Sequence, residues 1–92
     1  MAKLGEQEIE QRLANLNGWK KAGNAIQKQF TLADFKESMF FVNGVASLAE
    51  KAGHHPDITI NYNRVTLSLS THDAGGITGK DFDLAQRAEA LL

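Results

Sequence analysis

Between Leu32 and Ala49, apolar residues recur every three or four positions, which is the spacing of one face of an α-helix. The first stripe on this helix consists of Leu32, Phe35, Met39, Val42, Ala46 and Ala49. A second stripe beside it consists of Phe41, Val45 and Leu48. A helix with two apolar faces needs two partners, so we expect one face to cover a sheet and the other to be available to a neighbouring subunit.

The ends of this long helix are marked by residues that favour caps. Thr31 is expected to cap its N-terminus, with Asp34 at the third helical position as in a capping box. Gly53, followed by Pro56, is expected to end it, because glycine adopts the left-handed conformation and proline cannot continue a helix.

Alternation of apolar and polar residues predicts two β-hairpins. The first spans residues 19–30 and turns at Gly23-Asn24. The second spans residues 57–71, and Asn63-Arg64 is its expected turn because asparagine tolerates positive φ.

These patterns give the element order helix, two strands, helix, two strands, helix. The first helix is expected over about residues 5–16 and the last from near Thr78 to Leu92. Hairpin-linked strands interleaved with helices favour an α+β fold in which helices cover one face of an antiparallel sheet. A chain of 92 residues suits a single domain spanning residues 1–92.

Composition narrows the possible functions. The sequence has no cysteine, which excludes disulfides, thiolate zinc sites and a cysteine nucleophile. Its 10 basic and 11 acidic residues lack the basic patch expected of a nucleic-acid binder. No stretch approaches the roughly 18 apolar residues of a membrane span, and the polar N-terminus is unlike a secretory signal, so we expect a cytoplasmic protein. A domain this small often gains stability by self-association.

The three histidines of the chain, His54, His55 and His72, are expected to gather at one end of the second hairpin. Continuing the predicted register places His55 opposite His72, and directly opposed residues have Cβ atoms about 4.5–5.5 Å apart. In strict alternation these two side chains point away from the apolar face, so they could line a cleft. The alternative is that they are ordinary surface residues.

Two kinds of chemistry suit three histidines. An unperturbed imidazole titrates at about 6.5 and exchanges protons near neutrality, which suits acid–base catalysis. Three imidazoles could instead hold a zinc ion with one open position. Zinc is the less favoured hypothesis, since adjacent histidines on an extended segment tend to diverge.

Around these histidines the sequence resembles the pterin-4a-carbinolamine dehydratase family. The matching segments are Glu50-Lys51-Ala52-Gly53-His54-His55-Pro56, Tyr62-Asn63, Ser70-Thr71-His72-Asp73-Ala74-Gly75-Gly76 and Asp81, with Gly18-Trp19 and Gln29-Phe30 upstream. The resemblance covers nearly the whole chain. Ala74 stands where family members often have cysteine, and Gly53 stands where Asn or Asp is common, so a substrate contact from that side chain would be missing.

The resemblance implies a four-stranded antiparallel sheet with three helices. It also implies homodimers or homotetramers in which sheets join edge to edge and the long helices pack together. The implied reaction is dehydration of a 4a-hydroxytetrahydropterin without a metal or an organic cofactor. His54, His55 and His72 would be catalytic, with His55 as the principal acid–base group because of its predicted place opposite His72. The residues expected to bind or surround the pterin are Glu50, Gly53, Pro56, Ser70, Thr71, Asp73 and Asp81.

Some of these residues have structural alternatives. Asp81 lies three positions after Thr78 and could simply complete a helix cap. Glu50 could be a solvated residue of the last helical turn, and Trp19 is more typical of a core. The family also suggests an alternative function as a binding module, either a dimerisation partner of a transcription factor or a carboxylase assembly factor.

Overall fold

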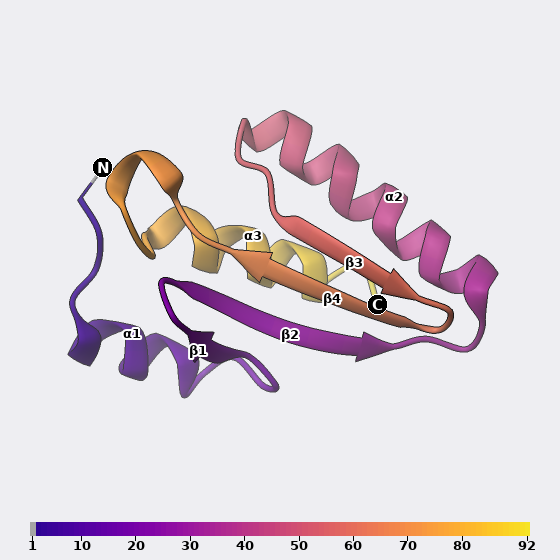
Figure 1. The fold of residues 1–92 in the computed structure, drawn as a ribbon, viewed down its shortest axis with the longest axis horizontal. Coiled ribbons are helices and arrows are strands. Elements are labelled where there is room, and N and C mark those ends of the chain that lie inside the picture. Colours follow the sequence, from indigo (N-terminus) through magenta and orange to yellow (C-terminus); the bar gives the residue numbers. More distant parts are fainter. Residues whose placement is uncertain (1) are drawn as a thin grey trace.

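The computed structural model describes residues 2–92 and has the predicted order of elements. The elements are α1 (Glu6–Leu13), β1 (Lys20–Ala22), β2 (Ala25–Thr31), α2 (Phe35–Ala52), β3 (Asp57–Asn61), β4 (Arg64–Leu69), the 3₁₀ helix η1 (His72–Ala74) and α3 (Gly79–Glu89). The strands form one antiparallel sheet in the order β1-β2-β4-β3 (Figure 1). The predicted α+β fold with a four-stranded sheet is confirmed.

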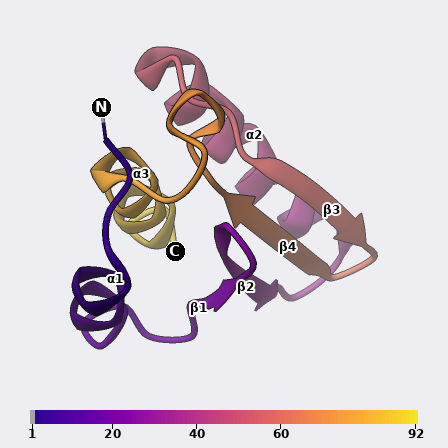
Figure 2. The same ribbon diagram turned by 60° about the vertical axis from the view of Figure 1, so that its left-hand side comes forward.

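The core lies between one face of the sheet and the helices. The strands bury Ile26, Phe30, Val65, Leu67 and Leu69 on this face, and α3 buries Phe82, Leu84, Ala85 and Ala88 against them. Helix α1 lies near β1 and adds Ile9 to the core (Figure 2). Trp19 is buried as expected and packs edge-on against Phe30, with their ring centroids 5.9 Å apart.

Helix α2 turns the second predicted stripe toward the sheet and exposes two residues of the first, Phe35 and Ala46. Its buried residues are Ser38, Phe41, Val45 and Ala49. In the first stripe Phe35 is 50% exposed, and on another side of the helix Phe40 is 62% exposed. The two-stripe pattern thus indicated correctly that α2 has more apolar surface than its own sheet covers. No helix within residues 2–92 is long and apolar enough to cross a membrane.

Three helix boundaries differ from the predicted ones. Helix α2 begins later because Asp34, not Thr31, is its N-cap, and the Asp34 carboxylate accepts a hydrogen bond from the N–H of Glu37 at 2.8 Å. Helix α1 ends at Leu13 and α3 ends at Glu89, each a few residues earlier than expected. After α1 the apolar spacing continues because Leu16 is buried in the turn that follows, whereas Leu91 and Leu92 after α3 are 44% and 64% exposed.

The hairpin of β3 and β4 turns one residue earlier than predicted. Tyr62 and Asn63 form the turn, with Tyr62 at φ 57°, so Asn61 pairs with Arg64. The reason lies outside the hairpin. The C=O of Asn63 accepts the N–H of Leu32 at 2.7 Å, and the Asn63 amide donates to the C=O of Leu32 at 3.3 Å. These bonds hold Asn63 at the tip of the turn, beside the segment that leads into α2.

The predicted opposition of His55 and His72 on paired strands is therefore wrong. Strand β3 begins at Asp57, after His55, and β4 ends at Leu69, before His72. If the histidine side chains lie close together, the segments that flank the strands must bring them there.

Lys28 interrupts the apolar face of β2 without leaving a buried charge unpaired. Its Nζ lies 2.6 Å from the carboxylate of Glu89 and also donates to the C=O of Asn17 at 3.0 Å. The indole N–H of Trp19 donates to the same Glu89 oxygen at 2.9 Å. This network connects the last turn of α3 to the sheet.

Candidate functional site

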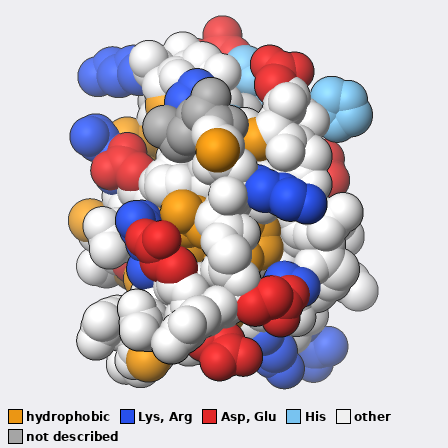
Figure 3. Space-filling view, turned by 90° about the vertical axis from the view of Figure 1, so that its left-hand side faces the viewer, with side chains coloured by type: hydrophobic (Ala, Val, Ile, Leu, Met, Phe, Trp, Pro, Cys, Tyr) orange, Lys and Arg blue, Asp and Glu red, His pale blue; other side chains and the backbone are white. Residues whose placement is uncertain are grey.

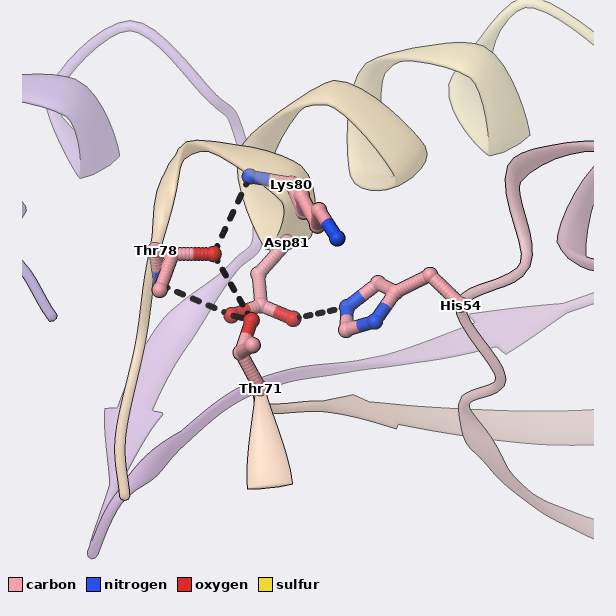
Figure 4. A network of polar contacts seen from close by, with 5 residues as sticks. All are labelled: His54, Thr71, Thr78, Lys80 and Asp81. Carbon is pink, nitrogen blue, oxygen red and sulfur yellow. Dashed lines mark hydrogen bonds and ion pairs between the residues drawn. The ribbon is translucent and has the colours of Figure 1, made fainter. Parts of the chain in front are cut away.

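The C-terminus of α2 places two histidines near the start of α3. The helix ends in a Schellman motif, in which Gly53 is left-handed at φ 63° and its N–H donates to the C=O of Glu50 at 3.3 Å. The N–H of His54 donates to the C=O of Ala49 at 3.1 Å. This motif fixes the backbone of His54, whose imidazole points toward the first turn of α3 (Figure 4).

Replacing Gly53 with alanine is expected to lower the free energy of unfolding by about 1 kcal/mol, since a Cβ makes the left-handed conformation costly. A Cβ at this position would meet nothing within 4 Å, so crowding plays no part. Gly53→Asn is the matched control and should be closer to wild type, because asparagine tolerates this conformation better. Urea unfolding measures both variants, and equal losses in the two would contradict the explanation.

The carboxylate of Asp81 lies at the centre of the site. It is fully buried, at 0% exposed, and its Oδ1 lies 2.5 Å from Nε2 of His54. Its Oδ2 accepts the N–H of Thr78 and the hydroxyl of Thr71, both at 2.9 Å. Figure 4 shows these groups converging from the segments after α2 and β4 and from the start of α3. Asp81 completes the capping box of α3, as one alternative expected, and it also holds His54.

His55 forms a second imidazole–carboxylate pair, at the surface. Its Nε2 lies 2.5 Å from Oε2 of Glu50, and the two side chains are 63% and 76% exposed. Glu50 belongs to the last turn of α2, where the helix dipole disfavours a negative charge. His55 gives this carboxylate a specific partner, and at 76% exposed Glu50 is also solvated, as the alternative expected. Histidine side chains reach the surface at this end of the molecule, beside acidic ones (Figure 3).

All three histidines border one hollow of about 280 Å³. It is lined by Gly53, His54, His55, Ser70, Thr71, His72, Asp73 and Lys80. His72 reaches it from η1 and is exposed. The histidines therefore come together as expected, but through the end of α2 and the turn of η1 rather than through strand pairing. Glu50 and Asp81 contact the histidines, whereas the half-buried Pro56 is not among the residues that line the hollow.

Two residues of the site were not predicted. Lys80 is the second residue of α3 and adds a cationic side chain to the hollow. Thr78 was expected only as a helix cap, but its hydroxyl also lies 2.7 Å from the hydroxyl of Thr71. A lysine next to Asp81 is a weak signal in a sequence, because exposed lysines are common on any surface.

A larger hollow, of about 470 Å³, lies between α1 and α3 and contains no histidine. Its charged side chains Arg12 and Asp83 pair within their own helices, with Glu8 and Arg87. The hollow at the histidines is therefore the better candidate for acid–base chemistry. Among residues 2–92, no group of three or more His, Asp or Glu side chains is arranged to hold a metal ion.

Known sequences match this chain over nearly its whole length. The family model described as Pterin 4 alpha carbinolamine dehydratase matches residues 2–91. A Roseiflexus castenholzii protein named "Putative pterin-4-alpha-carbinolamine dehydratase" is 57% identical over 91 residues, covering 99% of this chain and 98% of the relative. A protein of the same name from Acidobacterium capsulatum is 55% identical over 92 residues, which is 100% of both chains.

Solved structures share the fold. A crystal structure described as a transcriptional coactivator/pterin dehydratase from Brucella melitensis has a TM-score of 0.93 at 36% identity and covers 97% of each chain. A pterin dehydratase-like protein identified as a RuBisCO assembly factor in the alpha-carboxysome has a TM-score of 0.70 at 24% identity, over 82% of this chain and 89% of that one. The second likeness shows the fold alone.

Proposed function

Because the chain belongs to the pterin 4 alpha carbinolamine dehydratase family, we propose that it dehydrates a 4a-hydroxytetrahydropterin to a quinonoid dihydropterin and water, as in tetrahydrobiopterin recycling. The observation that carries the proposal is the gathering of His54, His55 and His72 around one hollow. Two of these imidazoles are each paired with a carboxylate, an arrangement suited to proton transfer.

The reaction needs one proton acceptor and one proton donor. The substrate carries a hydroxyl on carbon 4a, beside the N–H of N5. The C4a–O bond breaks as a proton is delivered to the departing oxygen, which leaves as water. The acceptor removes the N5 proton, and the electron pair of the N–H bond forms the C4a=N5 double bond. Because one proton enters the substrate as another leaves, two imidazoles suffice.

We assign the acceptor role to His54 and the donor role to the exposed His55 and His72. The strand pairing that favoured His55 as the principal group is absent, so that argument no longer holds. The position of His54 is the more constrained, because it is buried and bonded to a fully buried carboxylate. The polar side chains of Ser70, Asp73 and Lys80 line the same hollow and are proposed to bind the pterin.

Stopped-flow absorbance tests this function directly, with a chemically generated 4a-hydroxytetrahydropterin as the substrate. The wild-type protein is expected to accelerate the decay in proportion to its concentration, and to do so after treatment with a chelator. A decay no faster than the spontaneous one would contradict the proposal. A rate lost on chelation and restored by zinc would favour a metalloenzyme instead.

A binding module is the second candidate function, favoured by the apolar side chains that α2 leaves exposed. Phe35 and Phe40 are 50% and 62% exposed, and the nearby Leu92 is 64% exposed. We propose that α2 packs against further copies of the chain in a homodimer or homotetramer, with the edge strand β3 available for joining sheets. Light scattering tests this proposal, and a monomer would contradict it. An oligomer without dehydratase activity would favour the binding function.

A further inference from the structure

The hydrogen bonds behind Asp81 have fixed directions (Figure 4). Backbone N–H groups only donate: that of Lys80 donates to the hydroxyl of Thr78 at 3.2 Å, and that of Thr78 donates to Oδ2 of Asp81 at 2.9 Å. The hydroxyl of Thr71 also donates to Oδ2, at 2.9 Å, because an ionised carboxylate only accepts. The hydroxyls of Thr71 and Thr78 lie 2.7 Å apart. Since Thr71 has used its one proton, Thr78 is the donor in this contact.

Each hydrogen bond in this series therefore donates in the direction of Asp81. Two donors occupy its Oδ2, and its Oδ1 is left to accept from His54, 2.5 Å from Nε2. Nε2 accordingly carries a proton. A neutral imidazole has one N–H and one acceptor nitrogen, so Nδ1 carries the lone pair.

The second ring nitrogen of His54, Nδ1, is not fully enclosed by the protein. It has no hydrogen-bond partner within residues 2–92, and no buried side-chain nitrogen or oxygen of those residues lacks a partner. Nδ1 is therefore in contact with solvent, although His54 as a whole is only 9% exposed. Since His54 lines the hollow, Nδ1 is the nitrogen that a bound substrate can reach.

We infer that Thr78 and Thr71 are positioning residues, which fix the Asp81 carboxylate so that its Oδ1 holds His54 in the Nε2–H tautomer with Nδ1 as the proton acceptor. The inference rests on the proposed dehydration and adds a route for the proton. The chain of donors cannot reverse, because it ends in backbone N–H groups. A proton taken up at Nδ1 therefore returns through Nδ1 to the hollow rather than through the protein interior.

Asp81→Asn is the most direct test. Thr71 and the N–H of Thr78 need an oxygen at the Oδ2 position, so the asparagine NH₂ has to occupy the Oδ1 position and donate to Nε2. His54 is then forced into the Nδ1–H tautomer and loses its acceptor. Long-range ¹H–¹⁵N spectra of the histidine side chains should show Nε2–H in wild type and Nδ1–H in Asp81→Asn. The rate acceleration should fall by ~10²–10⁴-fold, the usual contribution of a general base.

Asp83→Asn is the matched control, because Asp83 lies on the same helix but is 58% exposed. It should keep both the wild-type tautomer and the wild-type rate. A second pair of variants tests the inference if Asp81→Asn does not fold. Thr71→Val removes one donor to Oδ2, so the carboxylate is held less firmly, and the rate should fall roughly tenfold, the low end of what one hydrogen bond to a charged group contributes. The tautomer should stay Nε2–H, because the carboxylate of Asp81 still only accepts. Thr71→Ser keeps the hydroxyl and should restore the wild-type rate.

An Nδ1–H tautomer in the wild-type protein would overturn the inference. So would an unchanged tautomer in Asp81→Asn, or, if that variant does not fold, a wild-type rate in Thr71→Val. The spectra are recorded without substrate, so they separate this inference from the proposed function. The predicted tautomers in a protein without dehydratase activity would contradict the function and leave the hydrogen-bond assignment standing.

Discussion

Replacing His54 with glutamine is expected to remove most of the dehydration activity while leaving the fold nearly intact. The glutamine amide can donate to Asp81 much as Nε2 of His54 does at 2.5 Å. It has no nitrogen that can accept the N5 proton of the substrate. Loss of a general base typically lowers the rate by ~10²–10⁴-fold, and we expect a loss in this range. Stopped-flow rates at saturating pterin measure it.

His54→Ala is the comparison that separates catalysis from stability. It should lose as much activity as His54→Gln and should also be less stable, because it leaves the buried Asp81 without one of its donors. If His54→Gln kept the wild-type rate, His54 would not be the base. His55, paired with Glu50 at the surface, would then be the next candidate.

Asp81→Ala is expected to cause the largest loss of stability among single substitutions in the site. It removes the acceptor of three hydrogen bonds, from His54, Thr71 and Thr78. Each buried group left without a partner costs about 1–3 kcal/mol. We therefore expect the free energy of unfolding to fall by about 3–5 kcal/mol, the range seen when a buried ion pair loses one member. Urea or thermal unfolding measures this loss.

Asp83→Ala provides the control for that measurement, since it lies two residues further along α3. The Asp83 carboxylate is exposed and pairs with Arg87 at 3.0 Å, four residues away on the same helix. Exposed pairs at this spacing contribute about 0.3–0.5 kcal/mol, which is the loss we expect. Similar losses in Asp81→Ala and Asp83→Ala would contradict the account of a buried network.

The helices and strands could be predicted from the sequence because burial of one face makes apolar residues recur at regular intervals. The alternation in β4 and the spacing in α2 each follow from one face packing against the core. Caps were readable where a particular side chain is needed, as at Gly53 and at the Thr78–Asp81 box. The start of α2 was misplaced because Thr31 and Asp34 are both good capping residues, and local sequence does not decide between them.

The pairing register of β3 and β4 could not be predicted from the sequence of the hairpin, because a distant contact selects the turn. Turns at Tyr62-Asn63 and at Asn63-Arg64 both use Asn63, and they shift the pairing of the whole hairpin. The choice depends on the hydrogen bonds between Asn63 and Leu32, 31 residues apart in the sequence. Patterns within the hairpin carry no information about such a contact.

The sequence predicted which residues form the site better than it predicted how the fold brings them together. The meeting of the three histidines was expected from strand pairing, but the structure achieves it through the Schellman turn after α2 and the short η1. The role of Thr78 was missed because it depends on the turn after β4, which brings the hydroxyls of Thr71 and Thr78 to 2.7 Å. Packing of the end of α2 against the first turn of α3 brings His54 to Asp81, 27 residues further along the chain.

Binding of a stable substrate analogue tests the three-histidine site most directly. Titration with 7,8-dihydrobiopterin, followed by NMR of the side chains, locates the bound ring. We predict that the imidazole signals of His54, His55 and His72 shift together and saturate, while Arg12 and Gln86 in the hollow between α1 and α3 do not respond. Unchanged histidine signals, with shifts at Arg12 and Gln86 instead, would contradict the account.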